Sequence, residues 1–413
     1  MQPVAGKLPC QSIHCKSHVT GSEFTMKPRV LLLSAYAAAS HQLWVTRLQL
    51  LFPEYAWTML ELPPRHFNWT IRSNSMLWAF RERELLQQAF DLLIATSMVD
   101  LSSLRGMVPA LTSIPTLVYF HENQFAYPSG DQREANVEPQ LVPLYAALCA
   151  DQIVFNSHYN RDSFLQGAMG LFKRLPDTIP DSVLLRLQAS CVVPVPVPVP
   201  VPTALIPATA QDLDSEAGNV AGRTLEIVWN HRWEYDKGAD LLLELCKRIS
   251  TDMLPMRLHI VGEQFRKQPV EFQQIDLLLN AHAAQLQISR GRFGFIAARS
   301  EYETLLAQSD VVLSTARHDF QGLAIQEACM LGCTPLAPNS LVYPEYLDSR
   351  FLYALGTDHA TTATGLCARL QQWHAQKAAG AALPKADLQG FSEAAVRPQY
   401  AQLFQQLLAT CQN

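Results

Sequence analysis

Five short apolar runs in the first half of the chain are separated by segments of helix length. Because the apolar residues are continuous rather than alternating, the runs predict strands buried on both faces, as in a parallel sheet covered by helices. Ligands bind such sheets at the carboxyl ends of the strands, so the residues after each run are candidates for chemistry. The runs are residues 30–34, 57–62, 92–96, 116–120 and 152–156, and the second of them leads into a predicted long loop at 63–72.

The same alternation of apolar runs and helix-length segments occurs in the second half, with strands predicted at residues 225–230, 257–263, 293–296 and 310–314. Apolar positions at helical spacing between residues 392 and 408 predict a closing helix. The pattern therefore predicts an α/β protein with two parallel sheets whose carboxyl edges face a cleft.

An alternation of valine and proline at residues 193–202, followed by a polar stretch to 223, separates the two halves. Such a segment predicts an extended polyproline strut acting as a linker, although a ligand for a proline-recognition module is an alternative. We expect a first domain at 26–192, closed by the helix at 392–413, a linker at 193–223 and a second domain at 224–391. Residues 1–25 are interpreted as a disordered leader or an added extension before a second start at Met26.

Composition narrows the class of protein. The chain has 413 residues, of which 48% are hydrophobic and 17% charged, which is typical of a folded protein with a substantial core. Its net charge of −5 argues against a generally basic nucleic-acid binder without excluding a local basic patch. The nine cysteines, an odd number, favour reduced thiols and a cytoplasmic location. No apolar run approaches the length of a membrane span.

One strand, turn and helix start carries two acids at fixed spacing. Asp319 lies in the turn after the strand at 310–314, Gly322 ends the turn, and Glu327 lies one turn into the helix that follows. Free backbone N–H groups at a helix start favour a phosphate, and Glu327 could accept hydrogen bonds from sugar hydroxyls. The motif predicts a nucleotide-sugar site, the alternative being an ordinary corner with two surface acids.

Two cations and a polar cluster follow other strands. Arg232 and Lys237 come after the strand at 225–230 and suit a leaving diphosphate, unless they are ordinary surface charges. His121, Glu122 and Asn123 follow the strand at 116–120, at the predicted ligand edge. No Walker loop, GxGxxG, HExxH or zinc ribbon occurs, so we expect chemistry that needs no metal and no cofactor.

Arginines and aromatic residues alternate between residues 65 and 83. Cations interleaved with aromatic rings suit phosphates and stacked bases. The alternative is aromatic residues that cover the core with exposed arginines between them. The residues are Arg65, Arg72, Arg81 and Arg83 with Phe67, Trp69, Trp78 and Phe80.

The order of these motifs resembles retaining GT-B glycosyltransferases with a spaced acidic pair. In the first half the resemblance narrows to the tRNA-queuosine α-mannosyltransferases. It is carried by Ser34-Ala35-Tyr36, Ser40-His41, Leu62-Pro63-Pro64-Arg65-His66-Phe67, Trp69, Ile71-Arg72, Phe120-His121-Glu122-Asn123-Gln124, Phe155-Asn156-Ser157 and Trp229-Asn230-His231-Arg232-Trp233-Glu234-Tyr235-Asp236-Lys237.

The resemblance implies two Rossmann-like domains and a role for each motif. The donor-binding residues implied are Arg232 and Lys237 at the diphosphate, Glu327 at the ribose and Asp319 at the hexose. Gly322 and Leu323, in the turn between the two acids, are also implied to bind the donor. His121 and Glu122 lie near the reacting centre, so that His121, Glu122 and Asp319 form the catalytic set. The acceptor contacts implied are Ser40, His41, Arg65, His66, Arg72 and Asn123.

By this resemblance the reaction is transfer of mannose from GDP-mannose to queuosine at the wobble position of a tRNA anticodon, with retention. The partners implied are a nucleotide sugar and a queuosine-containing tRNA. One alternative is a related transferase with another nucleotide sugar and a glycan or lipid acceptor. A second is a non-catalytic nucleotide-sugar binder, because Asp319 replaces the glutamate of many members and Ala37 and Ala38 stand where glycines are usual.

Overall fold

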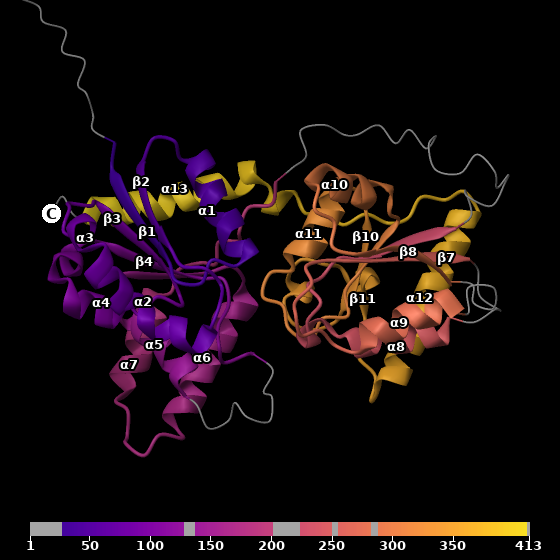
Figure 1. The fold of residues 1–413 in the computed structure, drawn as a ribbon, viewed down its shortest axis with the longest axis horizontal. Helices are drawn as coiled ribbons and strands as arrows, with labels where there is room; N and C mark the ends of the chain where they lie inside the picture. Colours follow the sequence, from indigo (N-terminus) through magenta and orange to yellow (C-terminus); the bar gives the residue numbers. More distant parts are fainter. Residues whose placement is uncertain (1–26, 128–136, 201–223, 250–254, 282–287, 411–413) are drawn as a thin grey trace, which may run out of the picture.

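The computed structural model describes residues 27–127, 137–200, 224–249, 255–281 and 288–410, which form two lobes, each built on one parallel sheet (Figure 1). The predicted α/β class with two parallel sheets is confirmed. The predicted leader at 1–25, the polar stretch at 203–223 and the end of the predicted closing helix at 411–413 lie outside the described residues.

The first sheet has five strands in the order β2-β1-β3-β4-β5, and all its neighbouring pairs are parallel. The central strands are completely buried, as their continuous apolar sequences predict. All five carboxyl ends therefore lie at one edge. The strands are β1 (Arg29–Ser34), β2 (Ala56–Glu61), β3 (Leu92–Thr96), β4 (Thr116–Phe120) and β5 (Gln152–Phe155).

Helices cover both faces of this sheet. Ser157 caps the start of α6 by accepting a hydrogen bond from the Asn160 N–H, and Asp100 caps α4 in the same way through Ser103. The helices are α1 (Ala39–Leu51), α2 (Phe67–Arg81), α3 (Arg83–Leu86), α4 (Leu101–Met107), α5 (Glu138–Cys149), α6 (His158–Phe172) and α7 (Asp181–Ser190), with the 3-10 turn η1 (Pro109–Ser113).

The second sheet has six parallel strands in the order β11-β10-β9-β6-β7-β8. Its helices are α8 (Ala239–Arg248), α9 (Glu271–Ala281), α10 (Arg299–Gln308), α11 (Leu323–Met330) and α12 (His359–Ala378). The strands are β6 (Leu225–Trp229), β7 (Met256–Val261), β8 (Ile288–Gly294), β9 (Val311–Leu313), β10 (Thr334–Pro338) and β11 (Leu352–Tyr353). Four 3-10 turns complete the lobe: η2 (Tyr235–Lys237), η3 (Tyr343–Glu345), η4 (Ser349–Phe351) and η5 (Gln389–Phe391).

The last helix, α13 (Glu393–Ala409), returns to the first lobe and lies against its strands (Figure 1). Tyr400 and Phe404 are buried in one apolar cluster with Trp44 and Phe52 of α1 and the turn after it. The indole N–H of Trp44 donates to the Tyr400 hydroxyl at 2.8 Å. The first lobe thus contains both the start and the end of the described chain.

The valine–proline segment is not a free strut where the structure describes it. Residues 193–200 are extended, but Val195, Val197 and Val199 are buried. Their N–H groups donate to Phe155, Gln321 and Phe391, which the alternating prolines cannot do. Prolines therefore occupy the positions whose nitrogen needs no partner, and Val195 and Val197 pack in the same apolar cluster as α13.

Two local predictions were wrong. The loop predicted at 63–72 contains the start of α2, because Ile71, Asn74 and Trp78 repeat at helical spacing on a buried face. Strand β8 runs through Ile288–Gly294 rather than 293–296, because the exposed Arg290 and Arg292 interrupt the apolar pattern of this edge strand. Strand β10 was not predicted, because Pro335 and Pro338 interrupt its apolar pattern.

We expect Phe404→Ala to lower the stability of the first lobe by about 3–5 kcal/mol, because it empties a fully buried aromatic site. Thermal unfolding monitored by tryptophan fluorescence should show a lower melting temperature for the lobe that contains Trp44. Leu408, which packs at the margin of the same cluster, provides the control, and Leu408→Ala should cost much less. Equal effects of the two changes would contradict the placement of α13 in this core.

Candidate functional site

The turn after β6 carries the two predicted cations. The guanidinium of Arg232 forms an ion pair with Glu234 at 3.1 Å. The ammonium of Lys237 is buried, donates to the carbonyl of His318 at 2.7 Å and lies 3.4 Å from Asp236 and 3.9 Å from Asp319. Lys237 therefore joins the two turns that follow β6 and β9, which are neighbours in the sheet.

The Asp319 carboxylate is held at three points before the start of α11. It accepts hydrogen bonds from the Gly322 N–H at 3.0 Å and from the Tyr343 hydroxyl at 3.0 Å, in addition to the charge of Lys237. Burial alone would raise its pKa, but Lys237 and these donors outweigh burial and lower it. Gly322 has a φ of +76°, and a Cβ there would collide with the Tyr346 hydroxyl, so this turn needs glycine.

Glu327 lies on α11 within a polar network. Its carboxylate pairs with the guanidinium of Arg299 on α10, which also binds Glu303 at 2.7 Å. The hydroxyl of Tyr302 accepts a hydrogen bond from Asn230 at 2.9 Å, at the end of β6. The network fixes Glu327 while part of its carboxylate stays open to solvent, as an acceptor for hydroxyl groups requires.

In the first lobe, His41 and His121 stack with ring centres 4.0 Å apart. Trp44 and Tyr119 pack edge-on against His121. Burial lowers the pKa of His41 to about 4 and that of His121 well below its usual range. Both imidazoles are therefore neutral at pH 7. Nδ1 of His41 and Nε2 of His121 are buried and have no hydrogen-bond partner among the residues that the structure describes.

Charges from the two lobes meet at Arg232. Burial would lower the pKa of Arg232, but the carboxylates of Glu234, Asp236 and Glu122 raise it above its usual value. Glu122 comes from the first lobe, two residues after β4, whereas Glu234 and Asp236 come from the second lobe, just before Lys237. Burial raises the pKa of Tyr36, and the charge of Glu122 raises it further. The carboxyl edges of the two sheets thus face each other across the site.

Two contacts fix the lobes relative to each other beside the site. The amide of Gln321 accepts a hydrogen bond from the Val197 N–H and donates to the Val197 carbonyl, at 2.9 and 2.8 Å. Glu345 of the second lobe accepts hydrogen bonds from the N–H groups of His158, at 3.0 Å, and Tyr159, at the start of α6. Gln321 lies between Asp319 and Gly322, so the donor turn is anchored to the segment that leaves the first lobe.

The remaining candidates for acceptor contacts fall into two groups. Ser40, Arg65 and His66 lie at the start of α1 and before α2, and the latter two are exposed. The side chain of Asn123 is used internally. Its amide donates to Asn160 and Ser163 and accepts from the N–H groups of Phe125 and Ala126. It shapes the loop after β4, and a direct contact with an acceptor would have to break these bonds. Arg72 binds Asp100 and Glu138, both at 2.7 Å.

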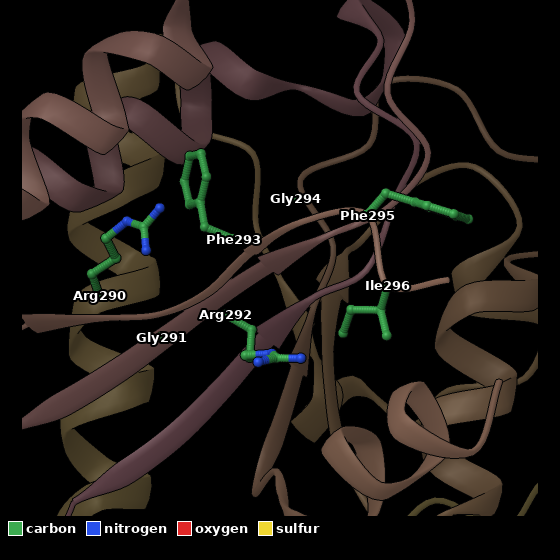
Figure 2. Close-up of a pocket in the computed structure, with 7 residues that line it drawn as sticks. All are labelled: Arg290, Gly291, Arg292, Phe293, Gly294, Phe295 and Ile296. Atoms are coloured by element: carbon green, nitrogen blue, oxygen red, sulfur yellow. The ribbon is translucent and has the colours of Figure 1, made fainter. Parts of the chain in front are cut away.

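A separate pocket lies on β8 and the turn after it. Figure 2 shows the side chains of Phe293 and Phe295 directed apart on either side of Gly294. The lining residues are 290–296, so none of the candidates predicted from the sequence contributes to it. Among the described residues, no group of three or more His, Cys, Asp or Glu side chains is arranged to hold a metal ion.

Several residues of this site were not predicted. Tyr343 reaches Asp319 from beyond β10, and Arg299 reaches Glu327 from α10, with no motif to mark either contact. Glu234 lies two residues after Arg232, within the motif from Trp229 to Lys237. Its role as the partner of Arg232 could have been inferred from this proximity in the sequence. Leu323, which begins α11 beside Gly322, packs at the margin of the first lobe's core.

Acid should destabilise the protein through its buried neutral histidines. Burial lowers the pKa of His41 and of His231 to about 4 in the folded protein. In the unfolded chain each histidine binds a proton below about pH 6.5, so acid favours unfolding. Their stabilisation is complete above pH 6.5 and is lost as the pH falls toward 4. Between pH 7 and pH 5 we expect a loss of about 2 kcal/mol for each histidine.

Melting temperatures measured across this range test the prediction. His41→Asn and His231→Asn should flatten the pH dependence, whereas His66→Asn, at an exposed position, should leave it unchanged. A melting temperature that stays constant from pH 7 to pH 5 would contradict the neutral state of the two buried rings.

Comparison with known families covers both lobes. Residues 29–199 match the family model "tRNA-queuosine alpha-mannosyltransferase N-terminal", and residues 211–372 match "Glycosyl transferases group 1". The chain is 29% identical over 343 residues to a tRNA-queuosine alpha-mannosyltransferase of Drosophila melanogaster, covering 81% of this chain and 85% of that protein.

Solved structures with the same arrangement of lobes include trehalose-phosphate synthases. That of Burkholderia vietnamiensis is 15% identical with a TM-score of 0.62, covering 94% of this chain and 100% of that chain. That of Burkholderia xenovorans is 15% identical with a TM-score of 0.61, covering 92% and 99%. These similarities show that the fold is GT-B. No helix in the described part of the chain is both long and apolar enough to cross a bilayer.

Proposed function

Because the chain belongs to the tRNA-queuosine alpha-mannosyltransferase family, we propose that it transfers mannose from GDP-mannose to queuosine in tRNA with retention of configuration. The observation that carries the proposal is the joining of two motifs in space. Lys237 lies 3.9 Å from Asp319, although the two residues follow different strands. A cation and a carboxylate placed together at a strand edge suit the diphosphate and the hexose of one donor molecule.

The second lobe holds the nucleotide sugar in this proposal. Arg232 and Lys237 bind the diphosphate and stabilise the negative charge that develops on it as the sugar leaves. Ligand phosphates would replace Glu234 as the partner of Arg232, because that ion pair is half-exposed at its arginine end. Glu327, oriented by Arg299, accepts hydrogen bonds from the ribose, and Asp319 accepts them from the hexose. The N–H group of Leu323, at the start of α11, faces the donor, whereas the N–H group of Gly322 orients the Asp319 carboxylate.

The first lobe presents the acceptor. His41 and His121 are neutral, and one nitrogen of each ring has no partner among the described residues, so in this proposal a sugar or cyclopentene hydroxyl that reaches the pair gains a hydrogen bond without adding charge. Glu122 lies opposite Arg232, where an acceptor hydroxyl would approach the donor. The proposed acceptor contacts are Ser40, His41, Arg65 and His66, with Arg72 and Asn123 shaping the surface around them. In this proposal the acceptor lobe is the domain expected at 26–192 and the donor lobe is the domain expected at 224–391.

The product of a single incubation tests this proposal. Queuosine-containing tRNA is incubated with the protein and GDP-mannose, digested to nucleosides and analysed by mass spectrometry. We expect one hexose on queuosine, released by an α-mannosidase and resistant to a β-mannosidase. Failure to add a hexose from any common nucleotide sugar would leave only a binding function. A β-linked product would contradict retention.

A further inference from the structure

The outward face of α2 is unlike the rest of the surface. Trp69, Met76 and Phe80 are 61%, 44% and 69% exposed, although large apolar side chains are usually covered. Together with Arg72 they repeat at helical spacing on the side opposite the buried Ile71 and Trp78. An exposed apolar stripe of this kind on a helix indicates a binding surface.

The charge of this surface is positive in an acidic protein. The chain has 37 acidic and 32 basic residues, but residues 65–81 contain three arginines and no aspartate or glutamate, and the next acids, Glu82 and Glu84, flank Arg83. Arg65, Arg81 and Arg83 are exposed, and none of their guanidinium groups forms an ion pair in the part of the chain that the structure describes. Arg72 instead binds Asp100 and Glu138, which holds its planar group in place.

The helix begins beside the proposed catalytic site. Phe67, its first residue, packs edge-on against Tyr36 with ring centres 5.7 Å apart. Tyr36 follows β1 and lies within the electrostatic field of Glu122 and Arg232. A ligand whose reactive group sits between the lobes can therefore extend from that point along α2.

We propose that this face of α2 is the surface on which the RNA of the acceptor docks. The inference rests on the proposed function and names the part of the protein that binds the acceptor outside its modified base. Arginines bind phosphates, and exposed aromatic rings stack on unpaired bases such as those of an anticodon loop. The α2 face consists of Trp69, Arg72, Met76 and Phe80 with the flanking Arg65, Arg81 and Arg83.

The affinity of the full-length protein for a queuosine-free tRNA transcript tests the surface without requiring turnover. Trp69→Ala and Phe80→Ala should each weaken binding about tenfold, as loss of a base-stacking ring does. Arg81→Glu should weaken it by a similar factor and reduce the salt dependence. In steady-state assays the same variants should raise KM for tRNA and leave kcat and KM for GDP-mannose unchanged.

Matched controls lie on other faces of the first lobe. Leu185 on α7 is 63% exposed, and Arg174 after α6 is exposed. Leu185→Ala and Arg174→Glu should bind the transcript as the unchanged protein does. Equal affinities of the α2 variants and these controls would overturn the proposal.

Two other results would also overturn it and are told apart by the same experiments. A dimer that Phe80→Ala makes monomeric, with unchanged affinity for RNA, would assign the face to self-association. If the unchanged protein binds no RNA, the docking surface and the proposed acceptor fail together. RNA binding that depends on α2, without any transfer of mannose, would support the surface and contradict the proposed function.

Discussion

Lys237→Ala is expected to lower kcat for mannose transfer by on the order of 100-fold or more. The Lys237 ammonium is buried between the turns after β6 and β9, 3.4 Å from Asp236 and 3.9 Å from Asp319. A charge placed there contributes most when the leaving diphosphate becomes more negative, so its loss affects kcat more than KM for the donor.

The same substitution also leaves two carboxylates without their shared cation, so stability must be measured beside turnover. Single-turnover rates at saturating GDP-mannose, together with the melting temperature, separate the two effects. Lys247→Ala is the matched control, because Lys247 lies on the neighbouring helix α8 with a side chain that is 53% exposed. Turnover of Lys237→Ala at the unchanged rate would remove Lys237 from the catalytic machinery.

Gly262→Ala is expected to abolish most activity, although residue 262 carries no functional group. Gly262 follows β7 with a φ of +152°, and a Cβ there would fall well inside the contact distance of the His231 carbonyl oxygen. Backbone atoms cannot turn away, so the turn that carries Arg232 must move. We expect kcat/KM to fall by on the order of 100-fold, since small displacements of a positioning group are costly, and stability to fall by about 2–3 kcal/mol.

A second glycine serves as the control for this change. A Cβ at Gly106, in α4, would meet no atom within 4 Å. Gly106→Ala should therefore keep full activity and stabilise the protein by about 0.5–1 kcal/mol, because alanine favours the helix. Normal kcat/KM for Gly262→Ala would mean that the Arg232 turn tolerates displacement and does not position the donor.

The parts of the fold that could be predicted are those in which local sequence and burial agree. Strands β3 and β4 are continuous apolar runs between turns, and their predicted bounds match the structure. Strand β10 carries two prolines and still pairs with β9 on one side and β11 on the other. Its place depends on the whole sheet and not on its own residues.

The site shows the same division. Arg232, Lys237 and Asp319 follow strands and Glu327 lies in the first turns of the helix after β9, so their positions along the chain place them at one edge of the sheet. The contact from Tyr343 to Asp319 crosses 24 residues, and the approach of Glu122 to Arg232 depends on how the lobes meet. No local pattern encodes either contact, because both arise only when separate elements pack together.

The exposure of the residues on the α2 face could not be predicted from the local sequence either. The alternation of arginine and aromatic residues between 65 and 83 fits both a surface for phosphates and stacked bases and a set of aromatic residues that cover the core. The structure separates these residues, since Trp78 is buried while Trp69 and Phe80 are exposed. Only the exposed set can contact an acceptor.

The most direct measurement of the central claim compares two forms of one tRNA as acceptors. One carries queuosine at the wobble position, and the other is the same tRNA with guanosine there. Both are incubated with the protein and radiolabelled GDP-mannose, and the label in the tRNA is counted. We predict label in the queuosine tRNA alone. Equal label in both forms, or none in either, would contradict the claim that this chain mannosylates queuosine.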